Sequence, residues 1–194
     1  ECDIHAGSGS VMRVVVTGGA GFIGSHLVDT LVARGDQVVV LDTLRRSDGS
    51  VPDPRHRAGW GDRVQTVVGD VRDAAAVARA LAPGADVVVH LAANAGVRRS
   101  IADPVSAVDV NVTGTATLLQ AMAERGVQRL VFASSSSVYS AATPRPSVED
   151  RAGERLASPY AASKRAAELL VACWADTHGA HATIARPFTV YGPR

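Results

Sequence analysis

Short apolar runs rich in valine alternate with longer stretches of helical periodicity along most of the chain. We expect strands at six such runs, residues 13–17, 37–42, 64–69, 86–92, 128–134 and 182–186. We expect helices at residues 22–34, 73–81, 104–125 and 159–178. Strands that are apolar on both faces, each followed by a helix, are typical of a parallel sheet covered on both sides. The pattern therefore predicts a doubly wound α/β domain.

The length of 194 residues corresponds to one domain and a fraction of a second, at about 150 residues per domain. Residues 1–11 contain Gly-Ser-Gly-Ser at positions 7–10 and are interpreted as a leader or tag, with Met12 as the natural start. We therefore expect a single folded domain over residues 12–194.

Charge and cysteine content exclude several classes of function. The chain has 20 Lys and Arg against 19 Asp and Glu, a net charge of +1, which argues against nucleic acid or an anionic membrane surface as a partner. Its apolar runs are too short to cross a membrane, and no secretory signal is visible. The two cysteines form neither a disulfide framework nor a metal-binding spacing. A cytoplasmic protein without a metal is the expectation.

A glycine-rich turn joins the first strand to the first helix. Gly18, Gly21 and Gly24 follow a G-x-x-G-x-x-G spacing, in which the first permits a tight turn and the second lets the backbone approach a pyrophosphate. The third allows close packing of helix and strand, and the helix N-terminus, at Phe22 and Ile23, directs N–H groups at the anion. A turn without a ligand is the alternative, but this context predicts a Rossmann-type nucleotide-binding domain.

An acidic residue at the end of the second strand is expected to bind the adenosine ribose. Asp42 has this position, and its carboxylate would repel a 2′-phosphate, which favours NAD over NADP. Arg45 and Arg46 follow closely and leave NADP open, because an arginine can accept that phosphate. Asp70 and Val71, after the third strand, are placed to reach the adenine, and the alternative is that Asp70 is a simple turn residue at the end of the strand.

Tyr160 and the only lysine of the chain, Lys164, are four residues apart near the start of the last helix, so they share one face. A neighbouring ammonium and a nicotinamide cation would both favour the phenolate, which could then take a proton from a sugar hydroxyl. An ammonium suits this role better than a guanidinium because it is compact. The alternative is a solvated lysine and a packing tyrosine, since Y-x-x-x-K alone is a weak signal.

Four consecutive serines, residues 134–137, follow the fifth strand. The carboxyl ends of parallel strands are where open α/β sheets bind ligands, so one of these hydroxyls could contact the reacting group. An ordinary serine-rich loop is the competing interpretation.

Taken together, these motifs resemble the extended short-chain dehydrogenase/reductase family over residues 12–194, and within it the NAD-dependent nucleotide-sugar epimerases and dehydratases. The motifs that carry the resemblance are TGGAGFIG (17–24), Asp42, GDV (69–71), HLAA (90–93), NVTGT (111–115), SSSSVY (134–139), PYAASK (159–164) and RPFTVYGP (186–193). AGVRRS (95–100) and RPFTVYGPR (186–194) are most similar to UDP-glucuronate 4-epimerases, with bacterial UDP-glucose 4-epimerases nearly as similar.

The resemblance implies a role for each matching residue. Tyr160 is the expected general base and acid, Lys164 orients it and binds the nicotinamide ribose, and Ser135 is the third catalytic residue. The implied cofactor-binding residues are Gly18, Gly21, Phe22, Ile23, Gly24, Asp42, Asp70, Val71, Leu91, Ala92, Ala93, Asn111, Tyr160, Lys164 and Pro187. The implied substrate-binding residues are Ser135, Ser136, Ser137 and Thr189, which would hold a sugar carboxylate.

The implied reaction is 4-epimerisation of a UDP-sugar, UDP-glucuronate to UDP-galacturonate, through transient C4 oxidation to a 4-keto sugar. Ser136 and Ser137 stand where the dehydratases have an Asp-Glu pair, which argues against dehydration, whereas Asn94 departs from the glutamine of the glucuronate branch. UDP-glucose or UDP-GlcNAc epimerisation, decarboxylation or reduction of a sugar nucleotide, and a non-catalytic NAD-binding relative remain alternatives.

Two further expectations concern assembly. Members of the family carry a smaller C-terminal part that binds the uridine diphosphate, and this chain is predicted to lack most of it. The family also dimerises through two long helices, which correspond to residues 104–125 and 159–178. The candidate contacts are Leu118, Leu119, Met122, Leu169, Leu170 and Trp174, and packing of these side chains on the sheet is the alternative.

Overall fold

A computed structural model describes residues 10–45, 49–52, 57, 59–139, 146–153 and 155–193. Most of the predicted leader, residues 1–9, lies outside the described residues, as do Arg46 and Arg194. Among the helices described, none combines the length and the apolar character needed to cross a bilayer.

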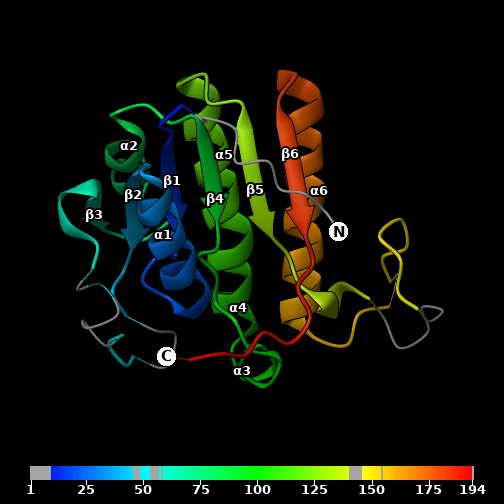
Figure 1. The fold of residues 1–194 in the computed structure, drawn as a ribbon. Helices are drawn as coiled ribbons and strands as arrows, with labels where there is room; N and C mark the ends of the chain where they lie inside the picture. Colours follow the sequence, from blue (N-terminus) through cyan, green and yellow to red (C-terminus); the bar gives the residue numbers. More distant parts are fainter. Residues whose placement is uncertain are drawn as a thin grey trace.

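The sheet has six strands, all parallel, in the order β3-β2-β1-β4-β5-β6 (Figure 1). The strands are β1 (Arg13–Thr17), β2 (Gln37–Asp42), β3 (Val64–Val68), β4 (Val87–His90), β5 (Arg129–Ala133) and β6 (His181–Ala185). This order is that of a doubly wound sheet whose strand order reverses between β1 and β4. The predicted Rossmann-type fold is confirmed.

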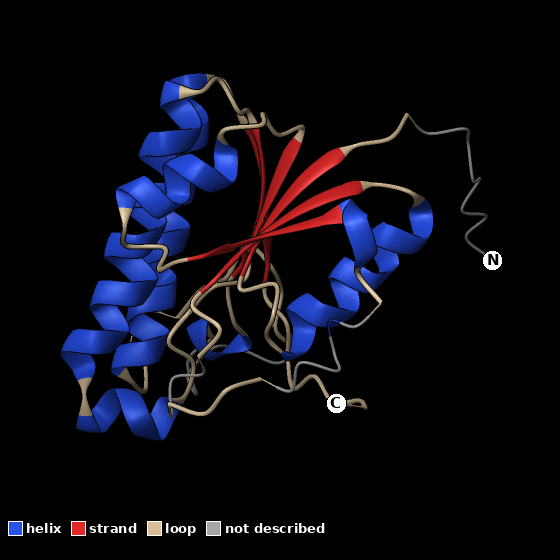
Figure 2. Cartoon of the chain, turned by 90° about the vertical axis from the view of Figure 1, so that its left-hand side faces the viewer, coloured by secondary structure: helices blue, strands red, loops and turns tan. Residues whose placement is uncertain are grey.

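Helices lie on both faces of the sheet (Figure 2). The helices are α1 (Phe22–Arg34), α2 (Ala74–Leu81), α3 (Val97–Ala102), α4 (Pro104–Val108), α5 (Gly114–Glu124) and α6 (Pro159–His178). The α1 face buries Val14 and Val16 of β1, while Val15 points to the opposite face, among the apolar side chains of α2, α5 and α6. Because side chains on both faces of the sheet are buried, the strands are continuous apolar runs in the sequence.

The predicted long helix at residues 104–125 is interrupted. A π-helical turn at Asp109–Thr113 separates α4 from α5. The buried Asn111 lies in this turn and accepts a hydrogen bond from the backbone N–H of Asn94 (2.8 Å) while donating to the hydroxyl of Ser163 (2.9 Å). The buried amide of Asn111 is thus hydrogen-bonded within the interrupted part of the helix.

The structure revises the candidate dimer contacts. Leu118, Leu119, Met122 and Trp174 are buried in the core between α5, α6 and the sheet, so they are unavailable to a second chain. Leu169 and Leu170 of α6 are 56% and 37% exposed. The prediction assigned too many positions to the outer surface because apolar periodicity alone does not separate a sheet-facing stripe from a partner-facing one.

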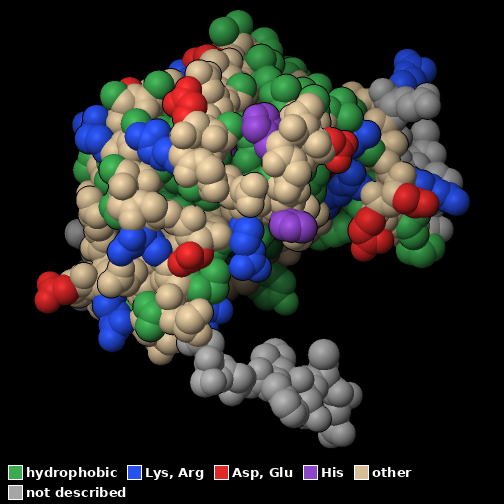
Figure 3. All heavy atoms as spheres, turned by 90° about the horizontal axis from the view of Figure 1, so that it is seen from above, with side chains coloured by type: hydrophobic (Ala, Val, Ile, Leu, Met, Phe, Trp, Pro, Cys, Tyr) green, Lys and Arg blue, Asp and Glu red, His purple; other side chains and the backbone are tan. Residues whose placement is uncertain are grey.

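The carboxyl ends of the strands, at the bottom of Figure 1, carry the residues predicted to be functional. The segment after β6 crosses this edge from β6 toward α1, where the carbonyl oxygen of Pro193 lies 2.9 Å from Nε2 of His26. At the opposite edge, basic and acidic side chains are interspersed (Figure 3). The fold therefore gathers its sequence motifs at a single edge of the sheet.

Candidate active site

The turn between β1 and α1 is closed too tightly for side chains. Gly18 has a φ of +72°, and a Cβ added there would lie 2.7 Å from the backbone nitrogen of Ala92. A Cβ on Gly24 would lie 2.2 Å from the carbonyl oxygen of Gly18. No side chain caps α1, and no acidic residue stands in its first turn. The N-terminus of α1 therefore suits an anionic group, as the glycine spacing predicted.

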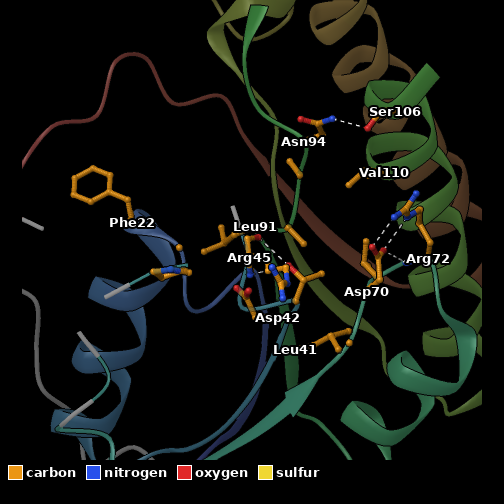
Figure 4. Close-up of a pocket in the computed structure, with 18 residues that line it drawn as sticks. Phe22, Leu41, Asp42, Arg45, Asp70, Arg72, Leu91, Asn94, Ser106 and Val110 are labelled. Atoms are coloured by element: carbon orange, nitrogen blue, oxygen red, sulfur yellow. Dashed lines mark hydrogen bonds and ion pairs between the residues drawn. The ribbon is translucent and has the colours of Figure 1, made fainter. Parts of the chain in front are cut away.

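A cavity of about 570 Å³ opens beside this turn at the ends of β1, β2, β3 and β4 (Figure 4). Nine of the predicted cofactor-binding residues line it, namely Gly18, Gly21, Phe22, Asp42, Asp70, Val71, Leu91, Ala92 and Ala93. The cavity lies at the point where the strand order reverses, which is the usual ligand site of open α/β sheets.

Asp42 ends β2 on the wall of this cavity. Its carboxylate accepts hydrogen bonds from the backbone N–H groups of Ala20 (3.0 Å) and Leu44 (2.8 Å). Burial raises the pKa of Asp42, and the two backbone donors oppose that rise. Arg45 lines the same cavity, so both a carboxylate and a guanidinium stand near the expected ribose. The two backbone contacts fix the position of the carboxylate on the cavity wall.

Asp70 and Arg72 form the opposite part of the wall. The Arg72 guanidinium donates to both carboxylate oxygens of Asp70, at 2.9 and 2.7 Å (Figure 4). It also pairs with Asp109. These hydrogen bonds lower the pKa of Asp70. Arg72 was not predicted as a site residue, because an arginine in a loop carries no motif.

A second cavity, of about 370 Å³, continues from the first. The two cavities share Gly18, Gly21, Phe22, Leu91 and Ala93, so they form one elongated groove around the glycine turn. The remaining predicted residues that line the second cavity are Ile23, Gly24, Ser135, Tyr160, Lys164 and Pro187. The structure thus brings together the three predicted catalytic side chains from the end of β5 and the first turns of α6.

Lys164 is buried, with 3% of its surface exposed. Its ammonium donates to the carbonyl oxygen of Ala133 (2.8 Å) and lies 5.0 Å from the ring centre of Phe132. Burial lowers the pKa of Lys164 to about 8, although the carboxylate of Glu168 acts in the opposite direction. The side chain is therefore not a solvated surface lysine.

The serines after β5 have different surroundings. Ser134 is buried and donates to Glu168 (2.5 Å), while the hydroxyl of Ser135 accepts the backbone N–H of Ser137 (3.1 Å). Ser136 and Ser137 do not line either cavity, and neither does Thr189, which is exposed on the segment after β6. Of the four predicted substrate-binding residues, the groove therefore contains only Ser135.

Asn111 was predicted to bind the cofactor, but it lies behind the groove. Its amide donates to the carbonyl oxygen of Asn94 (3.2 Å) as well as to Ser163, and it does not line either cavity. Asn94 itself lines the larger cavity. Asn111 therefore supports the segment after β4 that forms the cavity wall.

Several lining residues were not predicted as site residues, although Ala95, Phe188 and Val190 lie in motifs that carry the family resemblance. Phe188 and Val190 of the segment after β6 line the second cavity, as does Ala95. Thr43, Pro52, Ser106 and Val110 line the first. Their positions at the groove follow from the three-dimensional fold, with Ser106 on α4 and Val110 in the π-helical turn.

A dinucleotide-binding α/β protein is the class that this fold and groove define. The close approach of backbone at Gly18 and Gly24, together with a carboxylate at the end of β2, fits NAD. A family model described as the NAD dependent epimerase/dehydratase family matches residues 14–194, and the chain belongs to that family. The predicted family and its cofactor, NAD, are confirmed.

Individual relatives point in the same direction. The UDP-glucose 4-epimerase of Neisseria meningitidis serogroup B is 39% identical over 160 residues, 82% of this chain and 47% of that protein. The UDP-glucuronate 4-epimerase of Thermodesulfobacterium geofontis is 37% identical over 182 residues, 92% of this chain and 56% of that protein. The crystal structure of the Thermus thermophilus UDP-glucose 4-epimerase in complex with NAD is 38% identical, with a TM-score of 0.78 over 90% of this chain and 54% of that one. The chain spans about half the length of these proteins.

Proposed function

We propose that this chain forms the NAD-binding and catalytic part of a nucleotide-sugar 4-epimerase that acts on a UDP-sugar. The observation that carries the proposal is the groove itself, in which the dinucleotide cradle around Gly18 is continuous with the cavity that Ser135, Tyr160 and Lys164 line. When bound, NAD⁺ would accept the hydride that leaves the C4 carbon of the sugar.

The side chains of the second cavity handle the proton and the orientation of the sugar. Tyr160 accepts the proton of the C4 hydroxyl and later returns it, while Ser135 forms a hydrogen bond to the same oxygen. The ammonium of Lys164, which lines the same cavity as Tyr160 and donates to the Ala133 carbonyl, favours the phenolate form of Tyr160. The 4-keto sugar must rotate within the site so that its other face is reduced. Reduction on that face inverts the configuration at C4.

UDP-glucuronate is the first substrate to test, on the strength of the AGVRRS and RPFTVYGPR motifs. UDP-glucose is the second candidate and is favoured by the names of several relatives, including the one from Neisseria meningitidis serogroup B. Ser136 and Ser137 stand where the dehydratases that the chain resembles have an Asp-Glu pair. Epimerisation is therefore proposed ahead of dehydration, decarboxylation or net reduction.

The test is to incubate the complete gene product with NAD⁺ and, separately, with UDP-glucuronate, UDP-glucose and UDP-GlcNAc. Product analysis by NMR should show the C4 epimer of one sugar, with no carbon lost and no net NADH formed. The Tyr160→Phe variant should retain NAD⁺ binding and lose at least about 100-fold in turnover. Turnover by this variant within about threefold of the unmodified protein would exclude the proposed role of Tyr160, because general acid–base catalysis normally contributes more than that.

We also propose a homodimer formed through the outer surface of α3, α4 and α6. Ile101, Val105 and Leu169 are 62%, 76% and 56% exposed, and α3 and α4 both pack against α6. An apolar surface of this kind favours association with a second copy.

A further inference from the structure

A carboxylate one helical turn beyond Lys164 is buried more completely than the lysine. Glu168 is 1% exposed, and it continues the line of Tyr160 and Lys164 at four-residue spacing on α6. A buried charge is costly unless hydrogen bonds and opposite charges compensate it. The contacts of Glu168 therefore indicate the role of its charge.

The carboxylate of Glu168 accepts four hydrogen bonds. Oε1 accepts from the Ser134 hydroxyl (2.5 Å) and from Nε of Arg186 (2.7 Å). Oε2 accepts from Nη2 of Arg186 (2.9 Å) and from Nη1 of Arg165 (2.8 Å). Burial opposes ionisation of Glu168, but these donors outweigh it and hold its pKa below the ordinary value. The group is thus a fixed negative charge at neutral pH.

These contacts fasten two strand ends to one helix. Ser134 directly follows β5 and Arg186 directly follows β6. One turn earlier, Lys164 donates to the carbonyl oxygen of Ala133, the residue before Ser134. Two successive turns of α6 therefore hold two successive residues of the strand end that leads into Ser135.

We propose that Glu168 is a positioning residue of the active site, whose carboxylate fixes the strand end that carries Ser135 and places a negative charge one helical turn from the buried Lys164 ammonium. The functional meaning of this arrangement rests on the proposed role of Lys164, but the contacts do not depend on any substrate. A purely structural alternative is that the Glu168–Arg186 pair only anchors β6.

The charged and titratable groups around Lys164 come from several elements. Glu168 lies on the same helix, and Arg165 and Arg186 bind that carboxylate. His90 of β4 interacts electrostatically with Lys164, and Tyr160 lines the same cavity. Glu168 acts to keep Lys164 protonated, whereas the burial of the ammonium acts against it. Loss of the Glu168 charge should therefore favour the neutral amine.

The chain offers a direct readout, because Lys164 is its only lysine. Protein labelled with carbon-13 at the lysine Cε gives a single side-chain signal, whose chemical shift against pH reports the titration of Lys164 alone. The measurement needs neither NAD nor a sugar, so it stands even if the proposed function fails.

We expect Glu168→Gln to lower the midpoint of this titration by at least about one pH unit, a tenfold loss of proton affinity. Glu168→Asp retains the charge, so the midpoint of its Lys164 titration should stay close to that of the unmodified protein. Glu124→Gln, which removes an exposed carboxylate at the far end of α5, is the matched control and should leave it unchanged.

Removing one partner of a buried pair can prevent folding, so the double variant Glu168→Gln/Arg186→Gln is measured as well. The midpoint should also be lowered in this variant, by less than in Glu168→Gln because one cation is lost together with the carboxylate. If the Lys164 midpoint in the folded variants stays within about 0.2 pH units of the unmodified protein, Glu168 has a purely structural role and the proposal is wrong.

Discussion

The hydroxyl of Thr17, at the end of β1, lies 2.6 Å from Nδ1 of His90, at the end of β4. On the other side of the ring, Nε2 of His90 lies 3.0 Å from the hydroxyl of Thr115. That hydroxyl donates to the carbonyl oxygen of Asn111 (2.7 Å), so it accepts from Nε2. Because burial lowers the pKa of His90, the ring carries no second proton, and Nδ1 accepts from Thr17. His90 is therefore a neutral imidazole that joins the two central strands to the helix behind them.

This neutral state predicts a pH dependence of stability. Burial, with a contribution from the charge of Lys164, lowers the pKa of His90 to about 3. Between that value and the unfolded pKa of about 6.5, the unfolded chain binds a proton that the folded chain does not. The free energy of unfolding should therefore decrease as the pH falls from about 6.5 to about 5, with a slope that approaches about 1.4 kcal/mol per pH unit from this group.

Urea denaturation of the His90→Gln variant at several pH values tests this contribution. The variant should be less stable near neutral pH by about 1–3 kcal/mol, because hydrogen bonds to Thr17 and Thr115 are disturbed, but its stability should depend less on pH. His181→Gln, which changes an exposed histidine of β6, is the control. Equal pH slopes for His90→Gln and the unmodified protein would contradict the assigned protonation state.

The glycine turn predicts a selective loss of cofactor affinity. In Gly24→Ala the new Cβ would meet the carbonyl oxygen of Gly18 at 2.2 Å, so the turn must open and the N-terminus of α1 must move away from the pyrophosphate. Calorimetric titration should show NAD⁺ binding weakened at least about tenfold, and overpacking should cost about 1–3 kcal/mol of stability. Gly59→Ala, where a Cβ has no atom within 4 Å, should bind NAD⁺ normally. Normal binding by Gly24→Ala would show that the turn does not hold the dinucleotide.

Asp42 predicts the choice between NAD and NADP. Its carboxylate would accept hydrogen bonds from the adenosine ribose and repel a 2′-phosphate, whereas Arg45 on the same cavity wall would attract that phosphate. In Asp42→Asn the ratio of the dissociation constants for NADP⁺ and NAD⁺ should fall by about tenfold, since a charge contact of this kind is worth about 1–2 kcal/mol. Asp62→Asn, at an exposed carboxylate before β3, should leave the ratio unchanged. Tighter binding of NADP⁺ than of NAD⁺ by the unmodified protein would show that Arg45 dominates.

The sequence predicted those parts of the molecule that depend on local periodicity and on motifs. The bounds of β1, α1, β2 and α6 agree with the expected ranges, because glycine, proline and apolar spacing mark them. The six-residue helix α3 was missed, since a segment that short carries no apolar period. The contacts of Glu168 with residues 18 and 34 positions away were also outside the reach of any local pattern.

The exposed apolar surface of α3, α4 and α6 predicts self-association. Sedimentation velocity at micromolar concentration should show a dimer, and Leu169→Glu should shift it toward monomer, because a charge would be desolvated in the interface. Val51→Glu introduces the same charge at another exposed apolar residue, in the loop after β2, and should leave the dimer intact. A monomer in the unmodified protein at these concentrations would refute the proposed interface.

The replacement of Lys164 by arginine separates charge from shape. Net charge stays at +1, but the larger guanidinium must fit a site where the lysine is 3% exposed, beneath the Ala133 carbonyl and beside the Phe132 ring. The guanidinium is larger and planar, so it should not reproduce the position of the ammonium, and turnover of the UDP-sugar should fall on the order of 100-fold. Arg129→Lys, at an exposed residue that begins β5, is the control and should retain most of the activity. Measured NAD⁺ affinities would distinguish a defect in cofactor binding from a defect in catalysis. Turnover by Lys164→Arg within about threefold of the unmodified protein would contradict this prediction, because it would show that either cation suffices at this position.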